Sequence, residues 1–158
     1  MNPSNKKEFH LILPNIRSCH NVGAMFRTAD AFGVTKLWLV GYTAAPPKPQ
    51  IDKVSLGAET WILFEKIESH ELSSLVRKLK EEDFEIVALE KTDTSTPIQK
   101  KEFLAPVALI VGNEVDGVEN EILDMCDAVA HIPMYGKKES LNVSVAAGVA
   151  MFEISKYL

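Results

Sequence analysis

Short apolar runs alternate with segments of helical spacing along the whole chain, and this alternation restricts the fold more than any other feature. The apolar runs have the length of strands and lie at 9–14, 36–40, 61–67, 85–89, 108–112 and 128–133. Apolar residues recur at helical spacing in 21–32, 70–82, 118–126 and from 142 onward. Near-continuous apolar strands between helices are typical of a parallel sheet covered on both faces. We therefore expect a doubly wound α/β fold.

The length of 158 residues suits one domain, and no internal repeat is present. The proline-rich stretch 43–50 is too short to separate domains, and we expect it to be a surface loop. No apolar window reaches the length of a signal peptide or membrane span, which predicts a cytoplasmic location and no membrane partner. The cysteines, Cys19 and Cys126, lack the spacing of a zinc site or disulfide framework and are interpreted as reduced, buried thiols.

The charge balance argues against a nucleic-acid partner. The net charge is −5, whereas proteins that bind nucleic acids are usually basic because lysines and arginines neutralise phosphates. The only arginines are Arg17, Arg27 and Arg77. Lysine pairs at 6–7, 100–101 and 137–138 can still attract a polyanion locally. The charge therefore lowers the expectation of RNA binding without excluding it.

In parallel α/β sheets, ligands bind beyond the carboxyl ends of the strands. This rule selects Asn15–Asn21, Glu90–Thr94, Gly112–Gly117 and Pro133–Asn142. The segment "GNEVDG" at 112–117 matches neither a dinucleotide fingerprint nor a P-loop. Its glycines allow close backbone approach to a ligand, but a simple turn capped by Asn113 or Asp116 explains it equally well.

The segment "HNVGAMFRTADAFG" at 20–33 is an expected helix that ends at Gly33. Asn21 is a candidate cap, and Gly23 leaves room for another backbone or a ligand. For Arg27, an ordinary surface ion pair with Asp30 is the alternative to a functional role.

The stretch "ESLNVSVAAG" places Ser140, Asn142 and Ser144 at the start of an otherwise apolar helix. A helix cap needs only one of them, so the excess indicates a polar pocket at a buried helix start. Cys19 and His20 are sequence neighbours and make a poor catalytic pair. The four histidines have no metal-ligand spacing, and we expect no metal.

Taken together, "HNVGAMFRTADAFGV", "ALIVGNEVDGV" and "IPMYGKKESLNVSVAAGVA" resemble, in order and spacing, the signature motifs of the SpoU/TrmH RNA ribose 2′-O-methyltransferases of the SPOUT superfamily. The segment "KVSLGAETW" is similar to the stretch between the first two motifs, so the resemblance covers nearly the whole chain. It implies a C-terminal trefoil knot, which general topological rules would not have suggested.

The resemblance further implies that S-adenosylmethionine is the cofactor, S-adenosylhomocysteine the product, and a homodimer the working form. By motif position the expected cofactor contacts are Leu89, Gly112, Ile132, Met134 and Leu141. The implied catalytic set is Arg27, Asn21, Glu114, Ser140 and Asn142.

These residue types suit activation of a ribose hydroxyl, which is a poor nucleophile at neutral pH and needs orientation. Arginine stays protonated, so Arg27 is expected to stabilise the developing alkoxide or to act through an RNA phosphate. Glu114 and Asn21 would fix its guanidinium group. Ser140 and Asn142 would hold the ribose or the helix start.

We expect residues 1–158 to form one catalytic domain without a separate N-terminal RNA-binding domain. The substrate is expected to be RNA, tRNA ahead of rRNA, captured by the domain, its dimer or an accessory RNA-binding protein. One alternative is an inactive knotted module that binds S-adenosylmethionine and RNA. Another is an unrelated flavodoxin-like domain that binds a flavin or a nucleotide.

Overall fold

A seven-stranded parallel sheet forms the middle of the molecule. The computed structural model describes residues 7–158. The strands are β1 (Phe9–Pro14), β2 (Lys36–Val40), β3 (Leu63–Ile67), β4 (Glu85–Leu89), β5 (Thr96–Pro97), β6 (Val107–Val111) and β7 (Ala128–His131). Their order across the sheet is β3-β2-β1-β6-β4-β7-β5, and every pair is parallel.

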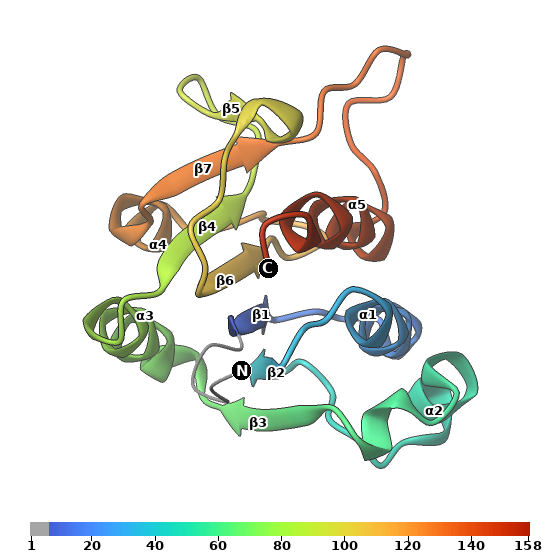
Figure 1. The fold of residues 1–158 in the computed structure, drawn as a ribbon. Coiled ribbons are helices and arrows are strands. Elements are labelled where there is room, and N and C mark those ends of the chain that lie inside the picture. Colours follow the sequence, from blue (N-terminus) through green and yellow to red (C-terminus); the bar gives the residue numbers. More distant parts are fainter. Residues whose placement is uncertain (1–6) are drawn as a thin grey trace.

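Helices cover both faces of this sheet (Figure 1). The helices are α1 (Cys19–Ala31), α2 (Pro49–Ser55), α3 (Leu72–Glu81), α4 (Asn120–Met125) and α5 (Val143–Ser155). Short 3₁₀ turns lie at Ala58–Thr60, Ser69–Glu71 and Ile98–Lys100. In Figure 1, α1, α2 and α5 lie on one side of the sheet, and α3 and α4 lie on the other. The predicted doubly wound α/β class is confirmed.

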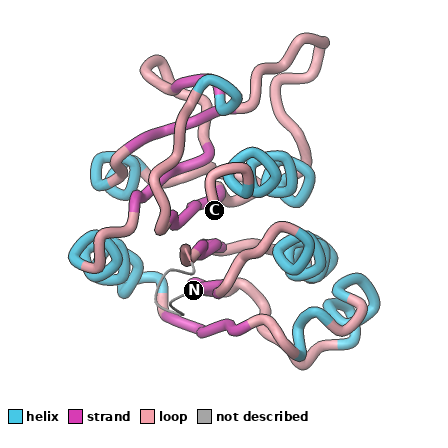
Figure 2. Tube along the Cα trace, in the orientation of Figure 1, coloured by secondary structure: helices cyan, strands magenta, loops and turns pink. Residues whose placement is uncertain are grey.

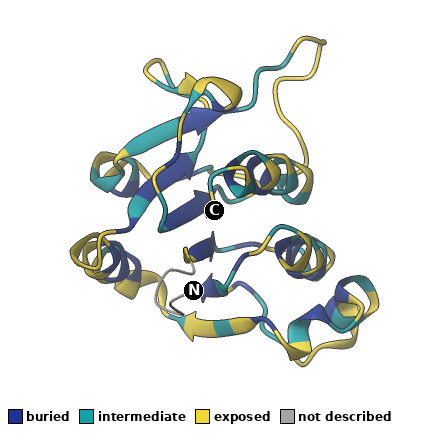
Figure 3. Cartoon of the chain, in the orientation of Figure 1, coloured by how far each residue is buried: buried dark blue, intermediate teal, exposed yellow. Residues whose placement is uncertain are grey.

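The central strands supply two apolar clusters, one on each face. Every residue of β6 is fully buried, and its side chains alternate between the faces. Leu109 packs in the cluster that contains α1 and α5 residues, whereas Ile110 packs in the cluster that contains α3 residues. Figure 3 shows the buried central strands and the exposed edge strand β3. Because both faces are buried, the central strands read as unbroken apolar runs.

Two elements differ from the sequence expectation. Residues 49–50, predicted to be loop, begin α2, with Pro49 at a first-turn position where its missing N–H costs nothing. The two-residue strand β5 was not predicted. The interpretation of the cysteines as buried is also wrong in degree, because Cys19 and Cys126 are half-buried, although neither forms a disulfide.

Gly23 explains how α1 and α2 pack closely. A Cβ atom at this position would lie 2.6 Å from the backbone oxygen of Ile51 in α2. Only glycine allows this approach without a shift of one helix. The expectation that Gly23 makes room for another backbone is therefore confirmed.

His10 makes stability depend on pH. Its Nδ1 accepts a hydrogen bond of 3.1 Å from the indole of Trp38, and burial, aided by the Lys36 ammonium, lowers its pKa from 6.5 to about 4. As pH falls below 6.5, the unfolded state takes up this proton first, so stability is lost. We expect the free energy of unfolding to fall by about 3 kcal/mol between pH 6.5 and 4 because of His10. Urea unfolding across this range should show a shallower pH dependence for His10→Gln, and equal slopes would contradict the assignment.

Candidate functional site

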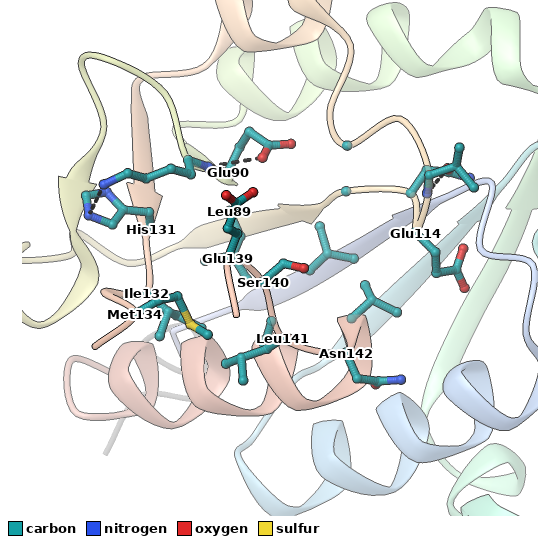
Figure 4. Close-up of a pocket in the computed structure, with 18 residues that line it drawn as sticks. Leu89, Glu90, Glu114, His131, Ile132, Met134, Glu139, Ser140, Leu141 and Asn142 are labelled. Atoms are coloured by element: carbon teal, nitrogen blue, oxygen red, sulfur yellow. Dashed lines mark hydrogen bonds between the residues drawn. The ribbon is translucent and has the colours of Figure 1, made fainter. Parts of the chain in front are cut away.

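A cavity of about 480 Å³ lies where the carboxyl ends of β4, β6 and β7 meet the start of α5. We call it the main cavity. Three of the four segments selected by the carboxyl-end rule contribute to it, including the long loop 132–142 (Figure 2). The expected cofactor contacts all line it: Leu89, Gly112, Ile132, Met134 and Leu141. All of these except Gly112 are labelled in Figure 4. The structure thus brings together residues that are up to 52 positions apart, from Leu89 to Leu141.

The loop 112–117 is held tightly against the cavity wall. A Cβ atom on Gly112 would lie 2.9 Å from the Cα of Gly117. Gly117 has a φ of +69°, and a Cβ there would overlap the carboxylate of Glu90. That carboxylate accepts hydrogen bonds from the backbone of Val118 at 2.9 Å and of Lys91 at 3.0 Å. Gly112 and Gly117 therefore allow the two ends of the loop 112–117 to pack closely against each other at the cavity wall.

Polar side chains from three distant segments form one chain of hydrogen bonds beside the main cavity. Glu114 accepts a bond of 3.3 Å from the amide of Asn21. The amide oxygen of Asn21 in turn accepts a bond of 3.3 Å from Asn142. Asn142 lies at the end of the cavity that faces α1 (Figure 4). We call Glu114, Asn21 and Asn142 the polar network.

Asn142 is also the cap of α5, as one of the sequence alternatives proposed. Its side-chain oxygen accepts bonds from the backbone of Ser144 at 2.9 Å and of Val145 at 3.4 Å. The hydroxyl of Ser144 donates to the same oxygen at 2.6 Å, so Ser144 supports the cap. Ser140 does not cap the helix and lines the main cavity instead.

The prediction that Asn21 caps its helix is wrong. The helix begins at Cys19, and the hydroxyl of Ser18 accepts a bond of 3.1 Å from the backbone of Asn21. The side chain of Asn21 is therefore available for the polar network. Asn113 caps a turn rather than a helix, because its side-chain oxygen bonds to the backbone of Val115 and Asp116.

Glu114 anchors the start of α1. Its carboxylate accepts hydrogen bonds from the backbone of Arg17 at 3.1 Å and of Ser18 at 3.4 Å. Partial burial raises the pKa of Glu114, but bonds from backbone N–H groups and from Asn21 outweigh this and leave the pKa below its usual value. An ionised carboxylate with its oxygens already occupied is suited to positioning rather than to accepting a proton.

Arg27 stands apart from the polar network. It is exposed on α1, and its side chain forms no hydrogen bond or ion pair with another residue of the part described, 7–158. The alternative pairing with Asp30 is not seen, because Asp30 accepts a bond of 2.7 Å from the indole of Trp61. Within one chain, Glu114 and Asn21 therefore do not hold the guanidinium group as the resemblance implied.

Sequence reasoning missed His131 as a cavity residue. It is buried at the end of β7, with Nδ1 within 2.8 Å of the Ser95 hydroxyl and Nε2 within 3.2 Å of the Lys91 ammonium. Burial and the nearby Lys91 charge lower its pKa and so favour the neutral ring. Its position at a strand end was the available signal, whereas the spacing of the four histidines bears only on metal binding.

No helix within residues 7–158 combines the length and apolarity needed to cross a membrane. No group of three or more histidine, cysteine or acidic side chains in the same range is placed to hold a metal ion.

The comparisons with known proteins agree with this geometry. The SpoU rRNA Methylase family matches residues 8–152. The chain belongs to this family. It is 35% identical to a tRNA (guanosine(18)-2'-O)-methyltransferase of Aquifex aeolicus, over 96% of this chain and 70% of the relative. It is 34% identical to the 23S rRNA (guanosine-2'-O-)-methyltransferase RlmB of Coxiella burnetii, over 92% of this chain and 57% of the relative.

A solved rRNA methyltransferase has the same fold. The AdoMet-bound rRNA methyltransferase from Sinorhizobium meliloti has a TM-score of 0.87 and 28% identity, over 96% of this chain and 57% of that one. The resemblance to SpoU/TrmH methyltransferases is confirmed, and the flavodoxin-like alternative is not supported. The chain spans little more than half of the Coxiella and Sinorhizobium proteins. The knot expected for this family remains a prediction.

S-adenosylmethionine fits the main cavity by its chemistry. Apolar walls that can enclose an adenine ring come from Leu89, Val111, Ile132 and Leu141. Glu90, Glu114 and Glu139 are among the residues that line the same cavity, and their negative charge favours a cationic sulfonium or ammonium group nearby. The cavity therefore offers both an apolar slot and a surrounding negative charge.

Proposed function

We propose that this protein transfers a methyl group from S-adenosylmethionine to the 2′-hydroxyl of a ribose in RNA. The observation that carries the proposal is the polar network of Glu114, Asn21 and Asn142 beside a cavity that fits the cofactor. Relatives that act on tRNA and on 23S rRNA support RNA as the substrate class.

The cofactor would be held mainly by Leu89, Ile132 and Leu141, with Gly112 and Met134 completing the cavity lining. When bound, S-adenosylmethionine supplies an electrophilic methyl group and leaves as S-adenosylhomocysteine. The protein's own task is to hold a ribose hydroxyl in line with that group. Ser140 and Asn142 lie on the cavity lining and are the proposed contacts for the ribose.

Arg27 is the proposed electrostatic stabiliser of the oxyanion that develops on the ribose. A guanidinium group is a hydrogen-bond donor and a cation, which suits this role rather than that of a base. Arg27 lies on α1. Glu114 positions the start of this helix by accepting hydrogen bonds from the backbone of Arg17 and from the side chain of Asn21. Lys137 and Lys138 are exposed on the loop that borders the main cavity and would attract RNA, whereas Lys6 lies outside the described residues.

Methyl-labelled S-adenosylmethionine and unmodified tRNA and rRNA pools provide the test. We expect the purified protein to transfer label to at least one RNA. Cofactor binding without transfer to any RNA would contradict the proposal and would favour the inactive binding module.

We further propose that the chain works as a homodimer through α1 and α5. Val145, Val149 and Phe152 form an apolar stripe on α5, with exposed fractions of 52%, 38% and 51%. Together with residues of α1 such as Ala24 and Thr28, the stripe lines a hollow of about 520 Å³. A second copy covering this face would remove the stripe from water. Arg27 lies one turn after Ala24, so the same contact would bring it beside the partner.

Charge placed in this face should break the dimer. We expect Phe152→Glu to be monomeric in sedimentation experiments and to lose methyl transfer, because a carboxylate would be buried without a partner. The matched control is Leu63→Glu on the exposed edge strand β3, where the side chain is 69% exposed. A dimer that persists in Phe152→Glu, or a monomeric wild-type protein, would show that this face is not the interface.

A further inference from the structure

A second cavity, of about 420 Å³, lies on the other side of the loop 112–117. It opens at the carboxyl ends of β1 and β2, beside the starts of α3 and α4. Asn113 and Gly117 line both cavities, so this loop is the wall between them. None of the roles above uses the polar groups that distinguish the second cavity: Tyr42, Ser69, His70, Asp116, Glu119 and Glu121.

The wall is fixed by hydrogen bonds that also fix Tyr42. The side-chain nitrogen of Asn113 donates to the hydroxyl of Tyr42 at 2.8 Å and to the backbone oxygen of Asn15. The backbone of Tyr42 donates to the Asn15 side chain at 3.0 Å. Tyr42 is nevertheless 56% exposed. An exposed aromatic ring anchored at its hydroxyl is preorganised to stack against a flat partner.

The turn that carries these groups is built around the Asn15 side chain. Asn15 has a φ of +51° and Gly41 a φ of +66°, both in the left-handed region. A Cβ atom on Gly41 would overlap the Asn15 side chain. The left-handed conformation is costly for Asn15 but not for glycine, and together the two residues place the Asn15 side chain between Tyr42 and Ser69.

The chemistry of the lining favours a nucleobase over a phosphate. Val40, Leu72 and Ile122 form an apolar floor. The carboxylates of Asp116, Glu119 and Glu121 form no hydrogen bond or ion pair with any residue in 7–158, so their oxygens are open to a ligand. Three carboxylates repel a phosphate but accept hydrogens from the edge of a base. Guanine fits best, because its N1–H and N2–H₂ donors are adjacent and match the two oxygens of one carboxylate.

Arg17 links this cavity to the polar network. Its backbone N–H donates to Glu114 at 3.1 Å. Its guanidinium group is exposed, and its pKa is raised by the Tyr42 hydroxyl and, to a smaller extent, by Asp116 and Glu114. A cation at this rim is placed for the phosphate that joins a base in the second cavity to a ribose beside the network.

We propose that the second cavity receives a guanine base of the RNA, at the methylated nucleotide or immediately next to it. Tyr42 stacks on the base, a carboxylate of the cavity accepts from its N1 and N2 edge, and Arg17 contacts the backbone. The proposal rests on the proposed function for the position of the ribose, and it assigns part of the RNA specificity to residues outside the cofactor site.

The test compares guanine with inosine in the substrate RNA, because inosine lacks only the N2 amino group. After the methylated site is mapped, inosine replaces each guanine within one nucleotide of it. We expect one replacement to lower kcat/KM of the wild-type protein by about tenfold or more, since a hydrogen bond to a charged acceptor is lost. In the triple variant Asp116→Asn/Glu119→Gln/Glu121→Gln, the ratio of kcat/KM for the guanine RNA to that for the inosine RNA should fall to about threefold or less. Its affinity for the cofactor should be unchanged.

Matched controls separate this effect from a general loss of negative charge. The variant Glu81→Gln, Glu82→Gln, Asp83→Asn removes three carboxylates at the other end of α3 and should keep the full preference for guanine. Tyr42→Ala should weaken RNA binding at least fivefold, while Tyr42→Phe, which keeps the ring but loses the bond from Asn113, should weaken it only about twofold. Fluorescence anisotropy measures this binding without any methyl transfer.

The outcomes also separate the two proposals. Active wild-type protein that does not distinguish inosine from guanine, or a cavity variant that keeps the distinction, would overturn the second-cavity assignment and leave the methyltransferase proposal standing. RNA binding that depends on Tyr42 without transfer to any RNA would overturn the proposed function and support the cavity.

Discussion

Replacing Arg27 with alanine is expected to lower the rate of methyl transfer by at least about 100-fold, because a preorganised cation at the developing oxyanion is lost. Affinity for S-adenosylmethionine should stay within a few-fold of wild type, since Arg27 does not line the main cavity. Single-turnover transfer and calorimetric cofactor binding measure the two effects. The control is Arg77→Ala, on α3 at the opposite face of the sheet.

A mixing experiment shows whether Arg27 acts within its own chain or in the partner's site. Coexpression of the Arg27→Ala and Asn142→Ala variants gives mixed dimers with one chain of each kind. If Arg27 acts in the partner's site, one of the two sites in each mixed dimer contains both wild-type residues, and the other contains neither. The expected recovery is about one quarter of wild-type activity. An unchanged rate in Arg27→Ala would remove this residue from the mechanism, and no recovery on mixing would place it within its own chain.

The second large effect is expected for Gly117→Ala. The new Cβ would overlap the Glu90 carboxylate at a residue whose φ is +69°, so the loop 112–117 must move. Because this loop forms a wall of the main cavity, we expect cofactor affinity to fall at least tenfold and the protein to be destabilised by about 1–2 kcal/mol. Calorimetry and urea unfolding measure these changes.

Gly136→Ala is the matched control for this variant. A Cβ at Gly136 has no atom within 4 Å, and the residue lies on the exposed part of the loop 132–142. It should bind the cofactor as wild type does. If Gly117→Ala also bound the cofactor with wild-type affinity, the close packing of Gly117 against Glu90 would have no bearing on the site.

The strands were predictable because a strand buried on both faces must be apolar at nearly every position, as in β6. The helices with apolar stripes, such as α1 and α3, were predictable for a similar reason. The elements missed were short. β5 has two residues, and α2 follows a run of prolines that is also typical of a loop. In such short elements tertiary contacts, such as those of Gly23 with Ile51, decide the structure.

The candidate site was only partly predictable. Three separate motifs supplied the residues of the polar network, but no sequence pattern shows that Asn142 donates to Asn21 and Asn21 to Glu114. The cap at α1 was misassigned because Ser18 and Asn21 are both good caps and lie three residues apart. No single motif marks the second cavity, since its lining comes from four separate parts of the chain.

The central claim is that the methyl group goes to a ribose oxygen, and alkaline hydrolysis of the labelled RNA tests it most directly. Alkali cleaves RNA through the free 2′-hydroxyl, so a 2′-O-methylated nucleotide stays linked to its neighbour. We predict that the transferred label will be recovered in alkali-resistant dinucleotides. Label recovered in mononucleotides would place the methyl group on a base and would contradict the account.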